Sequence, residues 1–187
     1  MSKSLFSTHK IAIMGMLTAL SVVVNVFAIQ VTPSNAINFV HTVTLIAGLT
    51  LGPYLAFIVG FLGSCIGFFI SPMGAYNVFF DISAGLSGLI FGFAFVFYRK
   101  VIKNKSFIKL IIIMLIAYIL VTIVCTAGIN TVACYVLYSN GTKTFFVYLF
   151  GRLPFQLITT LINCITSSVL VVALNKIQLF NKIFNID

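Results

Sequence analysis

Few side chains in this sequence could take part in chemistry, and they favour recognition over catalysis. The stretch SPMGAYNVFFD, residues 71–81, ends on Asp81, the only acidic residue before Asp187. Arg152 lies in the apolar stretch FGRLPFQ, and a planar guanidinium is suited to binding carboxylates. A single internal carboxylate cannot form an acid–base pair, and the chain has no Walker, G-x-S-x-G or H-E-x-x-H motif. We therefore predict that the protein is not an enzyme and uses no cofactor or metal.

Polar side chains near the ends of apolar runs are the candidates for ligand contact. We predict a substrate-binding set of Asn38, His41, Tyr76, Asn77, Asp81, Asn130, Lys143, Arg152 and Gln156. Structural alternatives remain open for several of them. Asp81 could be a first-turn anion favoured by the helix dipole, or an ion-pair partner of Arg152. Arg152 could extend to the headgroups, His41 could be a packing residue, and Lys143 could be a solvated loop lysine.

The composition places these residues in a membrane protein. The 187 residues are 61% hydrophobic and 7% charged, whereas soluble domains average about 25% charged residues. The net charge of +9 is explained by cations retained on the cytoplasmic side and by contact with anionic lipid. We therefore predict an integral membrane protein, in contact with the lipid bilayer, that binds no nucleic acid.

The apolar residues fall into six runs that are candidate spans of one membrane domain covering residues 1–187. These runs are residues 11–29, 38–52, 54–70, 78–98, 108–137 and 145–174. The second run is short, so Gly52-Pro53 could instead be a kink in one long helix. With six spans, nine of the eleven cations lie on the side of both termini. The positive-inside rule therefore favours an all-α protein with six transmembrane helices and both termini in the cytoplasm.

This topology places three polar connections outside the cell. They cover residues 30–37, 71–77 and 139–144, and they hold much of the polar chemistry outside the spans. We expect a polar bowl at the extracellular mouth of an apolar bundle, because small-molecule sites favour such concave surfaces. Ordinary solvated loops are the structural alternative.

Small residues recur on several of the predicted helices. Membrane helices approach each other through such faces. We expect internal packing for the glycines of the third and fourth runs. In the first helix Ala12, Gly15 and Ala19 share a face that little else explains, and we predict that this face docks on a partner protein. The four cysteines lie inside apolar runs without C-x-x-C spacing, so we expect free buried thiols.

Several stretches in chain order resemble the substrate-binding S components of energy-coupling-factor (ECF) vitamin transporters, in particular the folate group. The stretch from Gly15 to Ala19 resembles their A-x-x-x-A contact. AGLTLGPYLAFIVGFLGSCIGFFISPMGAY is similar to their A-G-x-x-x-G-P…G…P-x-G-x-Y core. LSGLIFG resembles the glycine helix that follows, GINTVACYVLYSNG the fifth helix, and GRLPFQLI the arginine-bearing sixth.

The resemblance implies a multi-pass subunit of the bacterial plasma membrane that captures a vitamin outside the cell, most directly folate or a related pterin. It also implies docking on an ECF module of one transmembrane T protein and two ABC ATPases, which hydrolyse the ATP. Two positions depart from the folate pattern: Ala36 replaces an Arg, and NVFFD follows Tyr76 in place of P-G-F-T. Two alternatives remain open. The first is an S component for another vitamin or a nucleobase-like ligand, and the second is a membrane protein that organises the cell envelope.

Overall fold

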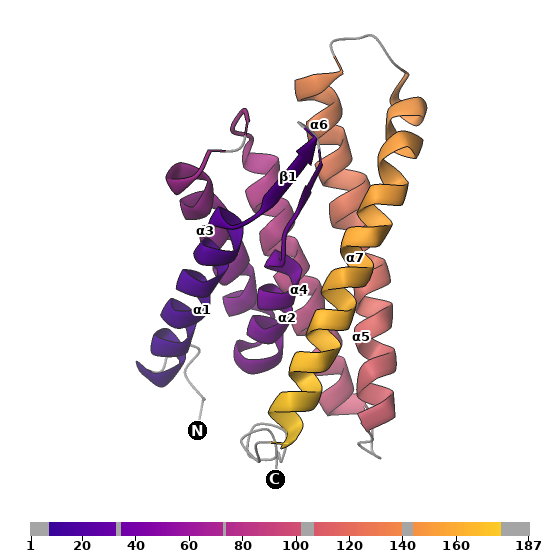
Figure 1. The fold of residues 1–187 in the computed structure, drawn as a ribbon. Coiled ribbons are helices and arrows are strands. Elements are labelled where there is room, and N and C mark those ends of the chain that lie inside the picture. The colour runs from indigo at the N-terminus through magenta and orange to yellow at the C-terminus, as the bar shows by residue number, and fades with distance from the viewer. Residues whose placement is uncertain (1–7, 33–34, 73, 102–106, 140–143, 177–187) are drawn as a thin grey trace.

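The computed structural model describes residues 8–32, 35–72, 74–101, 107–139 and 144–176, and nearly all of them are helical (Figure 1). In chain order the elements are α1 (Thr8–Val26), β1 (Ile29–Thr32), β2 (Asn35–Ile37), α2 (Val40–Leu51), α3 (Pro53–Ile70), α4 (Val78–Val101), α5 (Phe107–Val121), the π-helix η1 (Thr122–Asn130), α6 (Thr131–Tyr138) and α7 (Phe145–Lys176). Because α5, η1 and α6 follow one another without a break, they form a single helical path. The predicted all-helical architecture is confirmed.

Five helical segments in the described ranges are long and apolar enough to cross a membrane. They are α1, α3, α4, the α5–η1–α6 path and α7. The apolar helix α2 has only 12 residues, which at 1.5 Å per residue is about 18 Å. A hydrocarbon core is about 30 Å thick. Helix α2 therefore reaches only part of the way, and the β-hairpin continues from its start toward one end of the bundle (Figure 1).

The hairpin replaces the end of the first apolar run. Helix α1 ends at Val26, short of the predicted end at residue 29, and Ile29 begins β1. The two strands are antiparallel, Ile29 lies opposite Ile37, and the register shifts between Gln30 and Thr32. Hydropathy alone could not distinguish this short apolar strand from a last turn of helix. The consequence is a polar hairpin in the connection that the sequence predicted only as a loop.

Helices α3 and α4 approach each other at backbone distance. A Cβ atom at Gly60 would lie 2.3 Å from the carbonyl oxygen of Ala84, and one at Gly88 would lie 2.4 Å from that of Ala56. Only glycine fits at both positions, which confirms the internal packing predicted for this pair of helices. The close packing fixes the position of the N-terminal end of α4, where Asp81 is located.

The two ends of the bundle differ in charge. The start of α1 and the end of α7 lie at the same end of the molecule, together with the end of α4 and the start of α5 (Figure 1). Those helix ends carry Lys10, Arg99, Lys100, Lys109 and Lys176. The hairpin lies toward the other end, between the α1–α3 side and the α6–α7 side (Figure 1).

Candidate functional site

A cavity with two adjoining lobes lies at the hairpin end of the bundle. The first, called the Arg152 lobe, has a volume of about 200 Å³, and the second, called the Asp81 lobe, has about 210 Å³. Both are lined by Ala36, Asn38, His41, Phe80 and Asn130. Ligand pockets usually measure roughly 300–1,000 Å³. Each lobe alone is therefore below this range, and the two adjoin at the five residues that they share.

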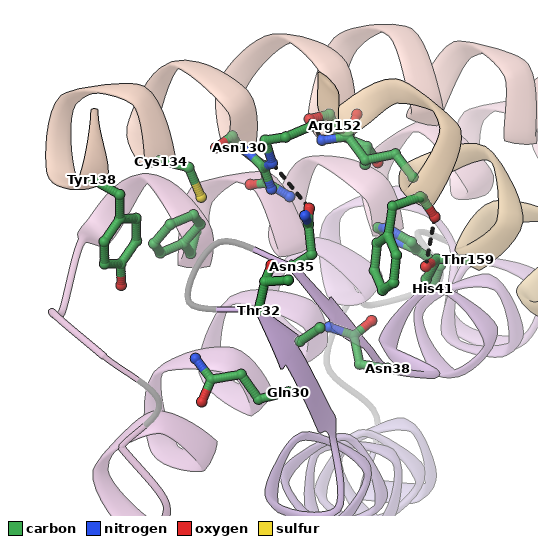
Figure 2. A pocket seen from close by; sticks show the side chains of 15 residues that line it. Gln30, Thr32, Asn35, Asn38, His41, Asn130, Cys134, Tyr138, Arg152 and Thr159 are labelled. Atoms are coloured by element: carbon green, nitrogen blue, oxygen red, sulfur yellow. Dashed lines mark hydrogen bonds between the residues drawn. The ribbon is translucent and has the colours of Figure 1, made fainter. Parts of the chain in front are cut away.

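Arg152 connects three elements around the first lobe. It is on α7 and only 8% exposed. Its Nε donates to Asn35 Oδ1 of the hairpin at 3.1 Å (Figure 2). Its Nη1 donates to the carbonyl of Asn130 at the end of η1 at 3.2 Å. The guanidinium also lies over the ring of Tyr148, 5.8 Å from its centroid. Arg152 thus holds the hairpin against η1 and α7 and gives this lobe a positive charge.

Gln156, one turn further along α7, has a side-chain amide whose orientation is fixed by its neighbours. Its Nε2 donates to the carbonyl of Thr126 at 3.3 Å and to Thr131 Oγ1 at 3.0 Å. A carbonyl can only accept, and the Thr131 hydroxyl already donates to Thr126 O at 3.0 Å. The side-chain nitrogen of Gln156 must therefore face η1, and its Oε1 accepts no hydrogen bond from the described residues.

Four buried polar atoms around the Arg152 lobe have no hydrogen-bond partner within the described ranges. They are His41 Nδ1, Thr126 Oγ1, Asn130 Oδ1 and Gln156 Oε1. Buried polar groups in proteins are almost always hydrogen-bonded, so each such exception requires an explanation. All four line one cavity. The described residues therefore leave hydrogen-bonding capacity unused in the lining of this lobe.

The π-helix η1 places two of these groups. Nine residues from Thr122 to Asn130 adopt it, and π-helical turns occur frequently at functional sites. Side chains of neighbouring helices bond to its carbonyls: Ser83 Oγ donates to Cys125 O at 3.4 Å, in addition to the bonds from Gln156 and Arg152. Helices α4 and α7 thereby stabilise the altered winding that brings Thr126 and Asn130 to the cavity.

Asp81 lies in the first turn of α4 and is 1% exposed. Ser64 Oγ donates to its Oδ1 at 2.6 Å, and the Tyr76 hydroxyl donates to its Oδ2 at 2.7 Å. The alternative of an ion pair with Arg152 is therefore wrong for the described structure, because Asp81 bonds to hydroxyls and the two charges line different lobes. The location of Asp81 in the first turn agrees with an anion favoured by the helix dipole.

Two residues of the connection before α4 have defined local roles. The hydrogen bond from Tyr76 to the Asp81 carboxylate raises the pKa of the Tyr76 phenol to about 12. Asn77 Oδ1 accepts a hydrogen bond from the backbone N–H of Phe79 at 3.0 Å, so Asn77 caps the start of α4 while it also lines the Asp81 lobe. The connection is thus fixed to the helix that it precedes.

Comparison with known proteins identifies the family. The sequence profile described as "ECF transporter, substrate-specific component" matches residues 9–171. The chain belongs to the S components of ECF transporters. It is 30% identical over 134 residues to the folate transporter FolT of Clostridium novyi (strain NT), an alignment that covers 72% of this chain and 73% of that protein. An S component is a transporter subunit and not an enzyme, and it is a multi-pass protein of the bacterial plasma membrane.

Solved structures share the fold of this S component. A crystal structure of FolT bound with folic acid matches with a TM-score of 0.62 at 24% identity, over 89% of this chain and 92% of that one. A structure of the S component of a bacterial ECF transporter matches with a TM-score of 0.62 at 20% identity, over 91% and 98%. The arrangement of helices in Figure 1 is therefore that of known S components.

The structure brings most of the predicted site residues of the S component together. Arg152 and Gln156 line the first lobe, and Tyr76, Asn77 and Asp81 line the second. Both lobes share Asn38, His41 and Asn130. Lys143 lies outside the described residues. Gln30, Thr32 and Asn35, which belong to the connection expected in the polar bowl, also line the first lobe. Four further polar lining residues were not predicted: Asn25, Ser64, Thr126 and Thr159.

Asn163 is a further residue that sequence reasoning missed. It is fully buried in α7. Its Nδ2 donates to the carbonyl of Asn38 at 2.8 Å and to that of Thr159 at 2.9 Å, while its Oδ1 accepts from Thr42 at 3.1 Å. Asn163 thus fixes the backbone between the hairpin and α2. An isolated amide in the middle of an apolar run was the available sign, since polar residues at membrane depth usually have a function.

Proposed function

We propose that this S component captures folate or a related pterin in the two-lobed cavity and delivers it to an ECF module for ATP-driven uptake. One observation carries the proposal: a chain 30% identical to a folate transporter has a cavity with unsatisfied buried polar atoms. The module consists of a transmembrane T protein and two ABC ATPases. The predicted binding residues, Asn38, His41, Tyr76, Asn77, Asp81, Asn130, Lys143, Arg152 and Gln156, are the proposed ligand contacts.

The distribution of cations supports an extracellular cavity. Lys10, Arg99, Lys100, Lys109 and Lys176 lie on helix ends away from the hairpin. Cytoplasmic loops and helix ends carry an excess of Lys and Arg. We infer that both termini are cytoplasmic and that the hairpin end faces outward. A cysteine placed in the connection at Ala75 would then react with a membrane-impermeant maleimide from outside, and one placed at Lys100 would react only after permeabilisation. The reverse pattern would contradict this orientation.

The outer face of α1 supports a docking role. Ala12, Gly15 and Ala19 are all exposed. A methyl group at Gly15 would meet no atom within 4 Å among the described residues. Without water to drive association, small residues of this kind allow close approach of another membrane helix. We propose this face as the contact with the T protein.

Replacing Ala19 with Trp tests the docking proposal. We expect Ala19→Trp to abolish uptake of radiolabelled folic acid by cells that co-express the module, while purified protein still binds folic acid. Val23→Trp, at an exposed position one turn further along the same face, shows how far the contact extends toward the end of the helix. Uptake that survives Ala19→Trp would contradict the assignment of this face.

Ligand identity is tested on the detergent-purified protein. Mass spectrometry of any small molecule that accompanies it, followed by calorimetric titration with folic acid, pteroic acid, thiamine, riboflavin, pantothenate and a deazapurine base, separates the possible ligands. We expect folic acid to bind most tightly. Tighter binding of another panel member would assign the S component to that ligand, and no binding by any of them would refute the proposed vitamin class.

A further inference from the structure

The carboxylate of Asp81 retains hydrogen-bonding capacity on both of its oxygens. An ionised carboxylate has two oxygens with about four acceptor sites in total. In the described structure each oxygen accepts one protein hydrogen bond, Oδ1 from Ser64 and Oδ2 from Tyr76. One acceptor site therefore remains on each oxygen. Two sites that are adjacent in this way match two parallel N–H donors, as a guanidinium matches a carboxylate.

The walls of the Asp81 lobe are suited to a flat ring. Phe68, Tyr76 and Phe80 line it. The Phe68 and Tyr76 rings pack against each other, with centroids 5.1 Å apart and planes tilted by 51°, and so belong to one aromatic wall. Aromatic walls favour a planar heterocycle through stacking contacts. The lobe thus combines flat apolar surfaces with a single buried carboxylate.

The other lobe has the opposite charge. Arg152 lines the first lobe, Asp81 lines the second, and Phe80 lines both. A ligand with a donor-rich ring at one end and carboxylates at the other would be oriented by this difference. Its ring would enter the Asp81 lobe, and its anionic end would face Arg152.

We propose that Asp81 receives two adjacent N–H donors of a planar heterocycle, such as the ring N–H and exocyclic amino group of a 2-amino-4-oxopyrimidine edge, and thereby determines ligand specificity and orientation. This inference rests on the proposed function, that the cavity captures a pterin-like vitamin. It adds the class of heterocycle edge that is recognised and the residue that recognises it. Ser64 and Tyr76 act as positioning residues, because their hydroxyls hold the carboxylate in place.

The test compares ligands and variants in one thermodynamic cycle. Folic acid and its 2-desamino analogue are titrated against the unmodified chain and Asp81→Asn. Asp187→Asn, which removes the other acidic side chain, is the control. A hydrogen bond to a charged group predicts that the unmodified chain and the control prefer folic acid by roughly 10- to 150-fold. Asp81→Asn should lose this preference and bind both compounds about equally.

Each result has a defined meaning. The comparison of the two ligands on the unmodified chain needs no variant, so it remains decisive if Asp81→Asn fails to fold. Equal affinity for both ligands on the unmodified chain overturns the inference and leaves the proposed function intact. A preference that persists in Asp81→Asn also overturns it, as does an equal loss of affinity for both ligands. If the unmodified chain binds neither compound, capture of a folate-like vitamin is refuted, and the inference is refuted with it.

Discussion

The bond between Arg152 and Asn35 predicts that the hairpin and α7 act together in ligand binding. Asn35 is on β2, whereas Arg152 is more than a hundred residues away on α7. Their side chains meet at 3.1 Å beside the cavity. Removing either partner releases the hairpin from the same position, so the second removal should add little to the first. The changes that test this are Asn35→Ala, Arg152→Ala and the double variant.

The expected coupling follows from the nature of the bond. A hydrogen bond to a charged group contributes about 1.5–3 kcal/mol, and Arg152 is buried enough that screening by solvent is weak. Each 1.4 kcal/mol is tenfold in affinity. The loss of affinity in the double variant should therefore be roughly 10- to 150-fold smaller than the product of the losses in the two single variants. Arg152→Ala should have the larger single effect, because it also removes the bond to Asn130.

Calorimetric titration with folic acid measures the cycle. Gln30→Ala combined with Arg152→Ala is the matched control, because Gln30 is on the same hairpin and lines the same lobe. Independent sites add to within about 0.3–0.5 kcal/mol, and we expect that result for the control. If the Asn35 and Arg152 effects also add to within this margin, the hairpin does not act through Arg152 and the reasoning is refuted.

Three further predictions concern stability and ionisation. Gly88→Leu should lower the free energy of unfolding by about 1–3 kcal/mol or more through overpacking, since a Cβ there already lies 2.4 Å from a carbonyl of α3. As the matched control, Gly15→Leu should leave the thermal unfolding midpoint in detergent unchanged, because a Cβ at Gly15 meets no described atom within 4 Å. Asn163→Leu should cost about 1–3 kcal/mol, because it removes the side-chain donor to the carbonyl of Asn38 and the acceptor of the buried Thr42 hydroxyl, and an unchanged unfolding midpoint would contradict this. The Tyr76 phenol is followed by its ultraviolet absorbance, as the difference between the titration curves of the native chain and of Tyr76→Phe. This phenol should ionise near pH 12, and Asp81→Asn should lower its pKa toward about 10. Because this pKa is raised on folding, the bond stabilises the protein fully below pH about 10 and is lost as the pH rises through about 12.

Hydropathy and small-residue patterns were sufficient to predict the helices and their closest packing. Long apolar runs have few other stable arrangements in a bilayer, because every backbone polar group must be bonded internally. The glycines of α3 and α4 likewise indicated a close approach, and Gly60 and Gly88 are located there. The candidate binding residues were found because a charge or amide among apolar residues is conspicuous.

The details that shape the cavity were beyond the sequence. The hairpin depends on pairing between two short strands, and an isolated pair of this size is stable only when packed against other elements. The π-helix η1 has the same apolar composition as an α-helix, so periodicity could not reveal it. Its winding depends on donors from Ser83, Arg152 and Gln156, which are distant in sequence. Likewise, only the fold brings Asn163 to the carbonyl of Asn38.

The separation of the two buried charges is the strongest physical argument for a binding role. A charged side chain at the bilayer centre costs about 2.5–3.5 kcal/mol, and less near the interface. If Asp81 and Arg152 served stability alone, contact between them would offset much of that cost. In the described structure Asp81 is instead held by hydroxyls in one lobe, and Arg152 is held by amide and carbonyl oxygens in the other. The two opposite charges therefore belong to the linings of different lobes, an arrangement that favours a ligand with the complementary distribution of charge.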